Sequence, residues 1–252
     1  MAEDKDAEIA RLKSDLEAAQ KQLSNMKDMA KVGELAATMA HEIRNPLAGI
    51  SSLSEVLRMK IGNTGPVGEI IDTILEEVDR LNRIIKDLLR FAKPGKAVLG
   101  SLNLPDTIGQ VLSFLDERIS EGRFEVTREF ADCPNVMADT EQMRQVFLNI
   151  LINAMDAIKD PKHTGQDEGK LTIKIEEIPD EKVVAVSLTD NGPGIPDEAM
   201  QDIFEPFFTT KAQGTGLGLA ACRKIIENHG GSISVDSTVG EGTTFVIKMP
   251  VA

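Results

Sequence analysis

Hydrophobic residues recur at alternating intervals of three and four along residues 3–30, which is the spacing of a helix with one narrow apolar seam. The seam consists of Ile9, Leu12, Leu16, Ala19, Leu23, Met26 and Ala30. Packing on the rest of the same chain is one interpretation, but no apolar segment nearby offers a long enough groove. We therefore expect residues 1–30 to form a parallel coiled coil with a second copy.

Two wider apolar stripes follow after a change of phase near residue 32. They cover residues 32–57 and 67–89 and are separated by the turn-rich segment 61–66. Two long amphipathic helices joined by a short loop form an antiparallel hairpin. Because the stripes are too wide for one hairpin to cover, residues 31–94 are predicted to pair with a second hairpin as a dimeric four-helix bundle.

The rest of the chain, residues 101–252, mixes the periods of strands and helices after a predicted hinge linker at 95–100 that stays irregular to Ser101. Strands are predicted at 123–130, 170–178, 182–190, 231–236 and 243–249, and helices at 105–120, 139–159 and 215–228. His229 ends the last helix, where a partial positive charge is favourable. This irregular order predicts an α+β two-layer sandwich, so the chain is expected to be multidomain, an all-α coiled coil and hairpin followed by this sandwich.

The composition narrows the possible partners and the compartment. Of the 252 residues 41% are hydrophobic and 27% are charged, as in folded proteins. The net charge of −13 argues against nucleic acid and anionic membranes, and without Trp or Tyr there is little aromatic surface for stacking on bases. No membrane segment or signal peptide is expected. The two cysteines lie far apart, which fits a reducing cytoplasm rather than a disulfide framework.

A first group of chemically capable residues is His-Glu-Ile-Arg-Asn-Pro-Leu at 41–47. At about 100° per residue, His41 points away from the apolar stripe, with Glu42 adjacent and Asn45 one turn further on the same face. A neutral imidazole has a nucleophilic nitrogen, and a carboxylate can hold the proton on the other nitrogen. A surface histidine beside a chance glutamate is the alternative. Pro46 favours a functional site, because a kink in mid-helix costs about 3 kcal/mol.

A second group is a polar strip on the apolar helix predicted over 139–159. Asn153 follows Asn149 by four residues and Asp156 follows Asn153 by three, so the three side chains share one face. Amides bonded to backbone in a core are one interpretation. The other is that the strip holds a hard cation together with phosphate oxygens, which would supply the polar partners that buried amides need.

Two glycine-rich turns complete the candidate chemistry. The turn Asp190-Asn191-Gly192-Pro193-Gly194 follows a strand, lets a flat ligand approach the backbone, and supplies a carboxylate that can accept from an exocyclic amine. The segment Gly214-Thr215-Gly216-Leu217-Gly218 opens a helix, whose free N–H groups and positive dipole end suit phosphate. Each turn alone is equally compatible with a turn that only connects two elements and binds no ligand. The second turn matches neither a P-loop nor a dinucleotide fingerprint.

In this order and approximate spacing, the motifs resemble the catalytic core of bacterial sensor histidine kinases of two-component systems. The matching segments are 41–47 (phosphoacceptor box), 149–156 (N box), 190–194 (G1 box), 204–208 (F box) and 214–218 (G2 box). The resemblance spans residues 31–252. It implies a HisKA dimerisation and phosphotransfer domain at 31–94 and a catalytic ATP-binding domain of Bergerat (GHKL) type at 101–252.

The resemblance also implies roles for single residues, with ATP and Mg²⁺ as cofactors. Asp190 would accept a hydrogen bond from the adenine amino group, Gly194 would let the base approach, and Asn153 would hold Mg²⁺. The other nucleotide-binding positions would be Asn149, Asp156, Gly192, Lys211, Gly214, Thr215, Gly216, Leu217 and Gly218. The glycines of the last motif would free a lid over the triphosphate.

The implied reaction is phosphorylation of His41 by ATP, with Glu42 as base or orienting group. The phosphate would pass to an aspartate on the receiver domain of a response regulator, and Asn45 would orient a water in the reverse, phosphatase, reaction. The implied assembly is a homodimer through coiled coil and bundle. Two alternatives stay open: a GHKL-type ATPase acting as a conformational clamp without phosphotransfer, and a non-enzymatic dimeric scaffold.

Overall fold

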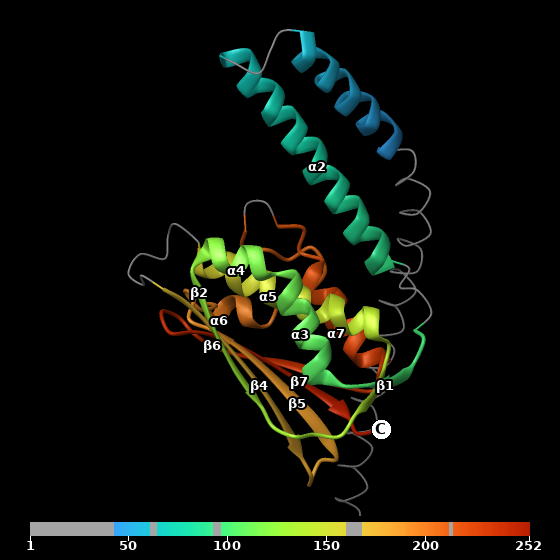
Figure 1. The fold of residues 1–252 in the computed structure, drawn as a ribbon, viewed down its shortest axis with the longest axis vertical. Coiled ribbons are helices and arrows are strands. Elements are labelled where there is room, and N and C mark those ends of the chain that lie inside the picture. Colours follow the sequence, from blue (N-terminus) through green and yellow to red (C-terminus); the bar gives the residue numbers. More distant parts are fainter. Residues whose placement is uncertain (1–42, 61–64, 93–96, 160–167, 212–213) are drawn as a thin grey trace, which may run out of the picture. The chain divides into compact units, whose positions relative to one another are not determined.

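The computed structural model describes residues 43–60, 65–92, 97–159, 168–211 and 214–252 (Figure 1). The chain divides into two compact units, Met1–Gly95 and Lys96–Ala252. The predicted coiled coil at 1–30 lies outside the described residues, and so do His41 and Glu42. None of the helices in the described ranges has the length and apolar character needed to cross a membrane.

The first unit is a helical hairpin, as its two apolar stripes predict. One helix covers residues 43–60 and the other is α2 (Pro66–Ala92). Leu47 of the first helix packs with Val78 and Ile85 of α2 in a small buried cluster. Val78 and Ile85 are two helical turns apart, so a single row of α2 side chains covers the neighbouring helix.

Much of the apolar surface of this hairpin stays exposed within one chain. The exposed side chains are Ile43, Ile50, Leu53, Val56, Leu57 and Met59 on the first helix and Val67, Ile70 and Ile74 on α2, each between 39 and 76% exposed. Contiguous apolar surface of this kind marks an interaction site in soluble proteins. The hairpin thus has the uncovered face that the width of its stripes predicts.

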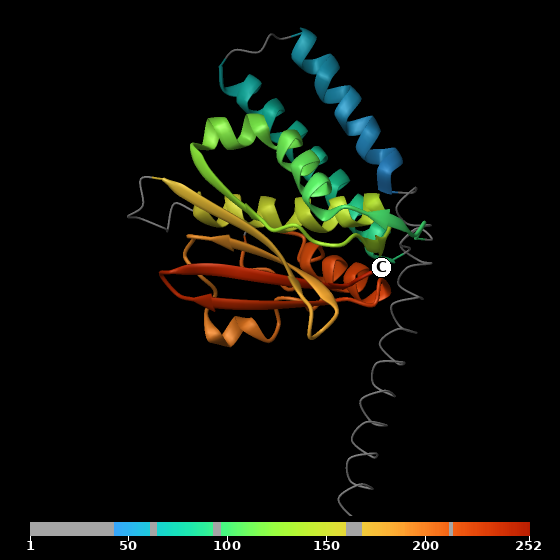
Figure 2. The same ribbon diagram turned by 60° about the horizontal axis from the view of Figure 1, so that its bottom comes forward.

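The second unit is a five-stranded mixed sheet with helices packed over one face, shown by Figures 1 and 2. In spatial order the strands are β2 (Phe124–Phe130), β4 (Gly169–Ile178), β5 (Val183–Asp190), β7 (Gly242–Pro250) and β6 (Ser232–Thr238). The helices are α3 (Leu104–Phe114), α4 (Asp116–Gly122), α5 (Thr140–Ile158), α6 (Asp197–Met200) and α7 (Gly218–Asn228). β2 pairs with β4 in parallel and the other pairs are antiparallel.

The core lies between the sheet and α5. Phe147 and Ile150 of α5 and Ile173, Val186 and Ile247 of the sheet are at most 1% exposed. Burying each such side chain contributes roughly 1.5–3 kcal/mol relative to leaving it in water. The alternation of strands β4, β5 and β7 places these residues on the helix side, which confirms the predicted two-layer sandwich after a helical hairpin.

The structure corrects the sequence prediction in two places. β1 (Gly100–Leu102) pairs with β3 (Val136–Ala138), so the prediction of irregular chain up to Ser101 was wrong. The single helix predicted over 105–120 is two helices, α3 and α4, which meet at the buried Leu115. Three-residue strands are too short to show a period of two, and no glycine or proline marks the break at Leu115.

Asp139 joins three segments of the second unit. Its Oδ1 accepts from the backbone N–H of Gln142 at 3.0 Å and caps α5, while its Oδ2 accepts from the N–H of Val98 at 2.7 Å. Its own N–H donates to Nε2 of the buried His229 at 3.0 Å, so the proton of that ring is on Nδ1, which donates to the carbonyl of Ile225 at 2.7 Å. His229 thereby connects the C-terminal end of α7 to the beginning of α5.

We expect Asp139→Ala to lower the free energy of unfolding of the second unit by roughly 1–2 kcal/mol at pH 7, because the variant loses the α5 cap and the Val98 acceptor. Urea unfolding measures the difference. Asp139→Asn is the control, because asparagine caps helices as well as aspartate but has only one acceptor oxygen, so it should recover the cap and not the Val98 hydrogen bond. Equal stability of Asp139→Ala and wild type would contradict the role of the cap.

The pH dependence of this stabilisation follows from the pKa of Asp139. Burial is the largest single cause and acts to raise that pKa, but the backbone hydrogen bonds from Gln142, Val98 and Glu141 and the nearby His229 together outweigh it, so the pKa is lowered from its ordinary value of 3.8. A carboxyl group with a lowered pKa stabilises the fold fully above its unfolded-state value. The gap between wild type and Asp139→Ala should therefore shrink as the pH falls below about 4.

Candidate functional site

The polar strip of α5 faces Lys211 and the beginning of α7. Asn153 Oδ1 accepts a hydrogen bond from Lys211 Nζ at 2.9 Å, and Asp156 Oδ2 pairs with the same ammonium group at 3.1 Å. Asn149 Nδ2 lies 3.5 Å from the carbonyl oxygen of Gly218. The structure thus brings together five residues predicted for the site from three separate parts of the sequence.

Asp156 has a second basic partner, which the sequence did not reveal. Arg118 of α4 forms an ion pair with Asp156 Oδ1, the oxygen that Lys211 leaves unoccupied. The side chains of Arg118, Asp156 and Lys211 are all 37–40% exposed, so the cluster is open to solvent. Arg118 belongs to no motif and precedes Asp156 by 38 residues, so only the tertiary contact could reveal it.

The turn after β5 packs against the C-terminal part of α5. The Asp190 carboxylate is buried at 5% exposure, and its Oδ1 accepts from the N–H of Gly192 at 2.8 Å. A Cβ on Gly192 would lie 2.7 Å from that oxygen and 3.4 Å from the Cβ of Ala157. Gly194 has φ +74°, and a Cβ there would lie 2.2 Å from the carbonyl oxygen of Thr238, so this position accepts only glycine.

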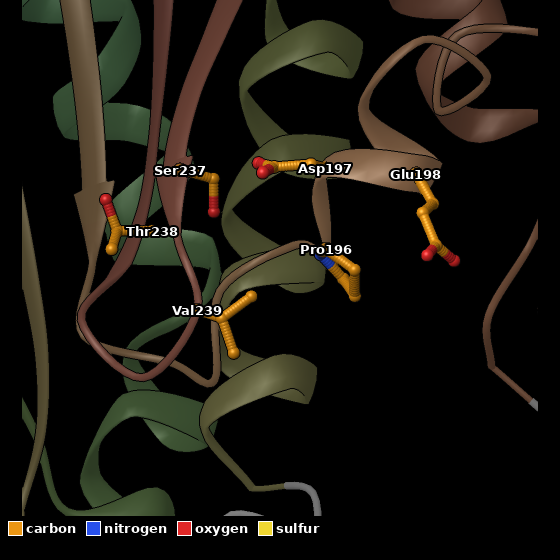
Figure 3. A pocket seen from close by; sticks show the side chains of 6 residues that line it. All are labelled: Pro196, Asp197, Glu198, Ser237, Thr238 and Val239. Carbon is orange, nitrogen blue, oxygen red and sulfur yellow. The ribbon is translucent and has the colours of Figure 1, made fainter.

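A hollow of about 480 Å³ lies beside this turn, between α6 and the end of β6 (Figure 3). Its lining residues are Pro196, Asp197, Glu198, Ser237, Thr238 and Val239. Figure 3 shows the Asp197 carboxylate directed toward Ser237 and the Glu198 side chain directed away. Ser237 Oγ accepts from the N–H of Ile195 at 2.8 Å, so this side chain fixes the turn. None of the predicted site residues lines the hollow.

The glycine segment before α7 closes a loop at its base. The N–H of Phe207 donates to the carbonyl of Gly216 at 3.0 Å. Gly216 has φ +66°, and a Cβ there would lie 2.4 Å from the carbonyl carbon of Phe207. A Cβ on Gly214 would lie 2.2 Å from Thr209 Oγ1. Glycine at position 216 therefore lets two backbone segments approach each other closely, and glycine at position 214 leaves room for the side chain of Thr209.

The N-terminus of α7 lies beside Asn149. The helix begins at Gly218, three residues later than predicted, and its N-cap residue Leu217 is apolar and buried at 1% exposure. Thr215 Oγ1 accepts from the N–H of Leu217 at 3.4 Å. Backbone N–H groups in the first turn and the positive end of the helix dipole can bind an anionic group here.

The predicted phosphoacceptor residues belong to the first unit. His41 and Glu42 lie outside the described residues. Asn45 is exposed on the helix of residues 43–60, and so is Pro46, whereas Leu47 is buried against α2. Asn45 therefore presents its amide to solvent.

The two units match two domain families. Residues 31–96 match the His Kinase A (phospho-acceptor) domain, and residues 138–252 match the family of histidine kinase-, DNA gyrase B- and HSP90-like ATPases. The second match defines the class of the sandwich and its nucleotide site. The chain belongs to the sensor histidine kinases and contains the two domains of their catalytic core.

Individual relatives agree with this assignment. Sensor histidine kinase ZraS of Salmonella typhi is 37% identical over 227 residues, which are 88% of this chain and 46% of ZraS, so the chain spans about half the length of this curated relative. The catalytic domain of histidine kinase ThkA is 37% identical with a TM-score of 0.53 and covers 61% of this chain and 95% of that domain.

Two further crystal structures contain a ligand or a partner. ThkA in complex with response regulator protein TrrA is 33% identical, with a TM-score of 0.63 and coverage of 88% of this chain and 62% of the other. Full-length ShkA in complex with AMPPNP is 27% identical, with a TM-score of 0.70. The match covers 87% of this chain and 46% of the ShkA chain.

Proposed function

We propose that this chain is the catalytic part of an ATP-dependent protein histidine kinase of a two-component system. It phosphorylates His41 from Mg-ATP, passes the phosphate to an aspartate of a response regulator, and dephosphorylates that regulator. Two observations together carry the proposal. Asn153 and Asp156 contact Lys211 beside the N-terminus of α7, and the same chain contains a phosphoacceptor domain. The ATP analogue bound to ShkA and the regulator bound to ThkA support it.

The nucleotide is proposed to lie along the polar strip of α5. Asp190 accepts from the adenine amino group at one end, where Gly192 and Gly194 keep the turn free of side chains. The phosphates extend past Asn153 toward the α7 N-terminus. The residues that meet them there are Asn149, Lys211, Gly214, Thr215, Gly216, Leu217 and Gly218.

The geometry around Asn153 suits a cation that accompanies the phosphates. The ammonium of Lys211 already lies between Asn153 Oδ1 and Asp156 Oδ2, so these oxygens attract positive charge. Mg²⁺ prefers oxygen ligands and keeps waters and substrate phosphates in its shell, so one amide oxygen from Asn153 is an adequate protein contribution. When bound, the metal neutralises charge on the phosphates during transfer.

The transfer forms a bond between a nitrogen of His41 and the γ-phosphorus and breaks the bond from that phosphorus to the leaving ADP oxygen. Glu42 polarises the proton on the other ring nitrogen, which assists attack by a neutral imidazole. Asn45 cannot act as a base, but its exposed amide can hold a water in line with the aspartyl phosphate of a regulator. Positioning of the reactants supplies most of the catalysis in this chemistry.

Four segments divide the work in this proposal. Residues 1–30 form a coiled-coil signalling helix, 31–94 the dimerisation and phosphotransfer hairpin, 95–100 a hinge linker whose last residue, Gly100, already belongs to β1, and 101–252 the catalytic ATP-binding domain. The hinge lets the catalytic domain approach His41 for transfer and withdraw for dephosphorylation.

The decisive experiment is incubation of the protein with γ-labelled ATP, followed by addition of candidate receiver domains. A histidine kinase gives an alkali-stable, acid-labile label that moves to the receiver. The clamp ATPase of the same superfamily gives ADP and free phosphate with no label on the protein. The phosphoacceptor match at residues 31–96 favours the kinase over the clamp.

A homodimer through the hairpin is the second part of the proposal, and the exposed row of Val67, Ile70 and Ile74 supports it. We expect Ile70→Glu to raise the dimer dissociation constant at least about tenfold, because a buried unpaired carboxylate is costly in an apolar interface. Sedimentation velocity across a concentration series measures it. Arg83→Glu adds the same side chain at an exposed position of α2 outside this row and should leave the dimer intact. Equal dissociation constants for both variants would contradict the interface.

A further inference from the structure

The Asp156 carboxylate is held between two cations that come from different elements. Its Oδ1 pairs with the guanidinium of Arg118 on α4, and its Oδ2 pairs with the ammonium of Lys211 before α7. Asn153, one turn earlier on α5, shares the ammonium. Arg118 lies outside every motif of the family, so its place at this site is a property of this chain's structure.

The charge balance of this cluster favours an anionic ligand. One carboxylate beside the proposed phosphate path would repel phosphate oxygens, but two cations around it leave an excess of positive charge. Each of the three side chains is 37–40% exposed, and an ion pair this open contributes only about 0–1 kcal/mol to stability. Support of the fold therefore explains little of the convergence of Arg118 and Lys211 on one carboxylate.

The cluster lies along the proposed path of the nucleotide on α5. Gly192 of the proposed adenine turn packs beside Ala157, and Gly218 of the α7 N-terminus lies beside Asn149. Asp156 lies between these two levels of α5, so a nucleotide that spans them would pass Asp156 and its partner Arg118. A guanidinium has a planar fork of donors that matches phosphate oxygens and can bind two of them at once.

We propose that Arg118 is a phosphate-binding residue of the nucleotide site and that Asp156 is a positioning residue for it. Without nucleotide, Asp156 holds Arg118 and Lys211 at the edge of the site. With Mg-nucleotide bound, the guanidinium of Arg118 turns from the carboxylate to the phosphate chain. This inference rests on the proposed function, because it requires that the strip of α5 binds a nucleotide.

The test compares three ligands on the full chain, which are Mg-ATP, Mg-ADP and adenosine. Calorimetry measures the first two, and an NMR titration of methyl groups measures the weaker adenosine. We expect Arg118→Met to weaken Mg-ATP and Mg-ADP binding about 10- to 100-fold, the size of a lost charge-assisted contact, with adenosine binding unchanged. Arg118→Lys should recover part of the loss, because it keeps the charge without the fork.

Arg144→Met is the matched control. Arg144 is on α5, pairs with Glu141, and is 38% exposed, so the substitution removes a similar surface arginine outside the site. This variant should bind all three ligands like wild type. Wild-type Mg-ADP binding by Arg118→Met, or an equal loss for adenosine and Mg-ATP, would overturn the role of Arg118. A wild-type chain that binds no nucleotide would instead refute the proposed function.

Discussion

Replacing His41 by glutamine abolishes labelling of the protein from γ-labelled ATP and leaves its affinity for Mg-ATP nearly unchanged. Glutamine is polar and of similar length, but its amide nitrogen is no nucleophile, so the expected loss of label is complete. The affinity is preserved because residue 41 belongs to the first unit, whereas the proposed nucleotide residues all belong to the second. Autoradiography of the gel-resolved protein and calorimetry give the two measurements.

The same substitution at His163, which lies outside every motif, is the control and should keep the label. Mass spectrometry of the labelled wild-type protein should place the phosphate on His41. Label retained in His41→Gln, or lost equally in His163→Gln, would refute the assignment of the phosphoacceptor. Loss of Mg-ATP binding in His41→Gln would contradict the proposal that the first unit accepts the phosphate and the second unit binds the nucleotide.

Replacing Asn153 by alanine weakens Mg-ATP binding about 100-fold, roughly 2.7 kcal/mol, and removes phosphorylation without unfolding the domain. The variant loses the amide oxygen that now holds the ammonium of Lys211 at 2.9 Å and that is proposed to bind the metal. Asn153 is only half-buried, so its loss leaves no sealed cavity in the core. Thermal unfolding should therefore change little.

The dependence on magnesium separates a metal ligand from a structural amide. Calorimetric titration with ATP in magnesium and in EDTA should show a large difference for wild type and a small one for Asn153→Ala. Asn228→Ala removes an exposed asparagine at the end of α7 and should behave like wild type. Unchanged Mg-ATP affinity in Asn153→Ala would make Asn153 a structural amide.

The periodic elements of this fold were predictable from the sequence. The alternation in 170–178 and 182–190 predicted the hairpin of β4 and β5, and the helical spacing in 139–159 predicted α5. These elements bury one face along their whole length, so the spacing of their hydrophobic residues identifies the buried face. The sequence therefore determined the order of helical hairpin and sandwich, and the motifs on them identified the family.

The tertiary structure alone decided the features that depend on contacts between distant segments. β1 and β3 are three residues long and exist because they pair with each other, with Ser101 opposite Met137. His229 is fixed by Asp139, 90 residues earlier, whose N–H donates to its ring. Arg118 belongs to the candidate site because α4 carries it to Asp156. The local spacing of hydrophobic residues does not predict these contacts between distant segments, because it reflects only the helix or strand in which each residue lies.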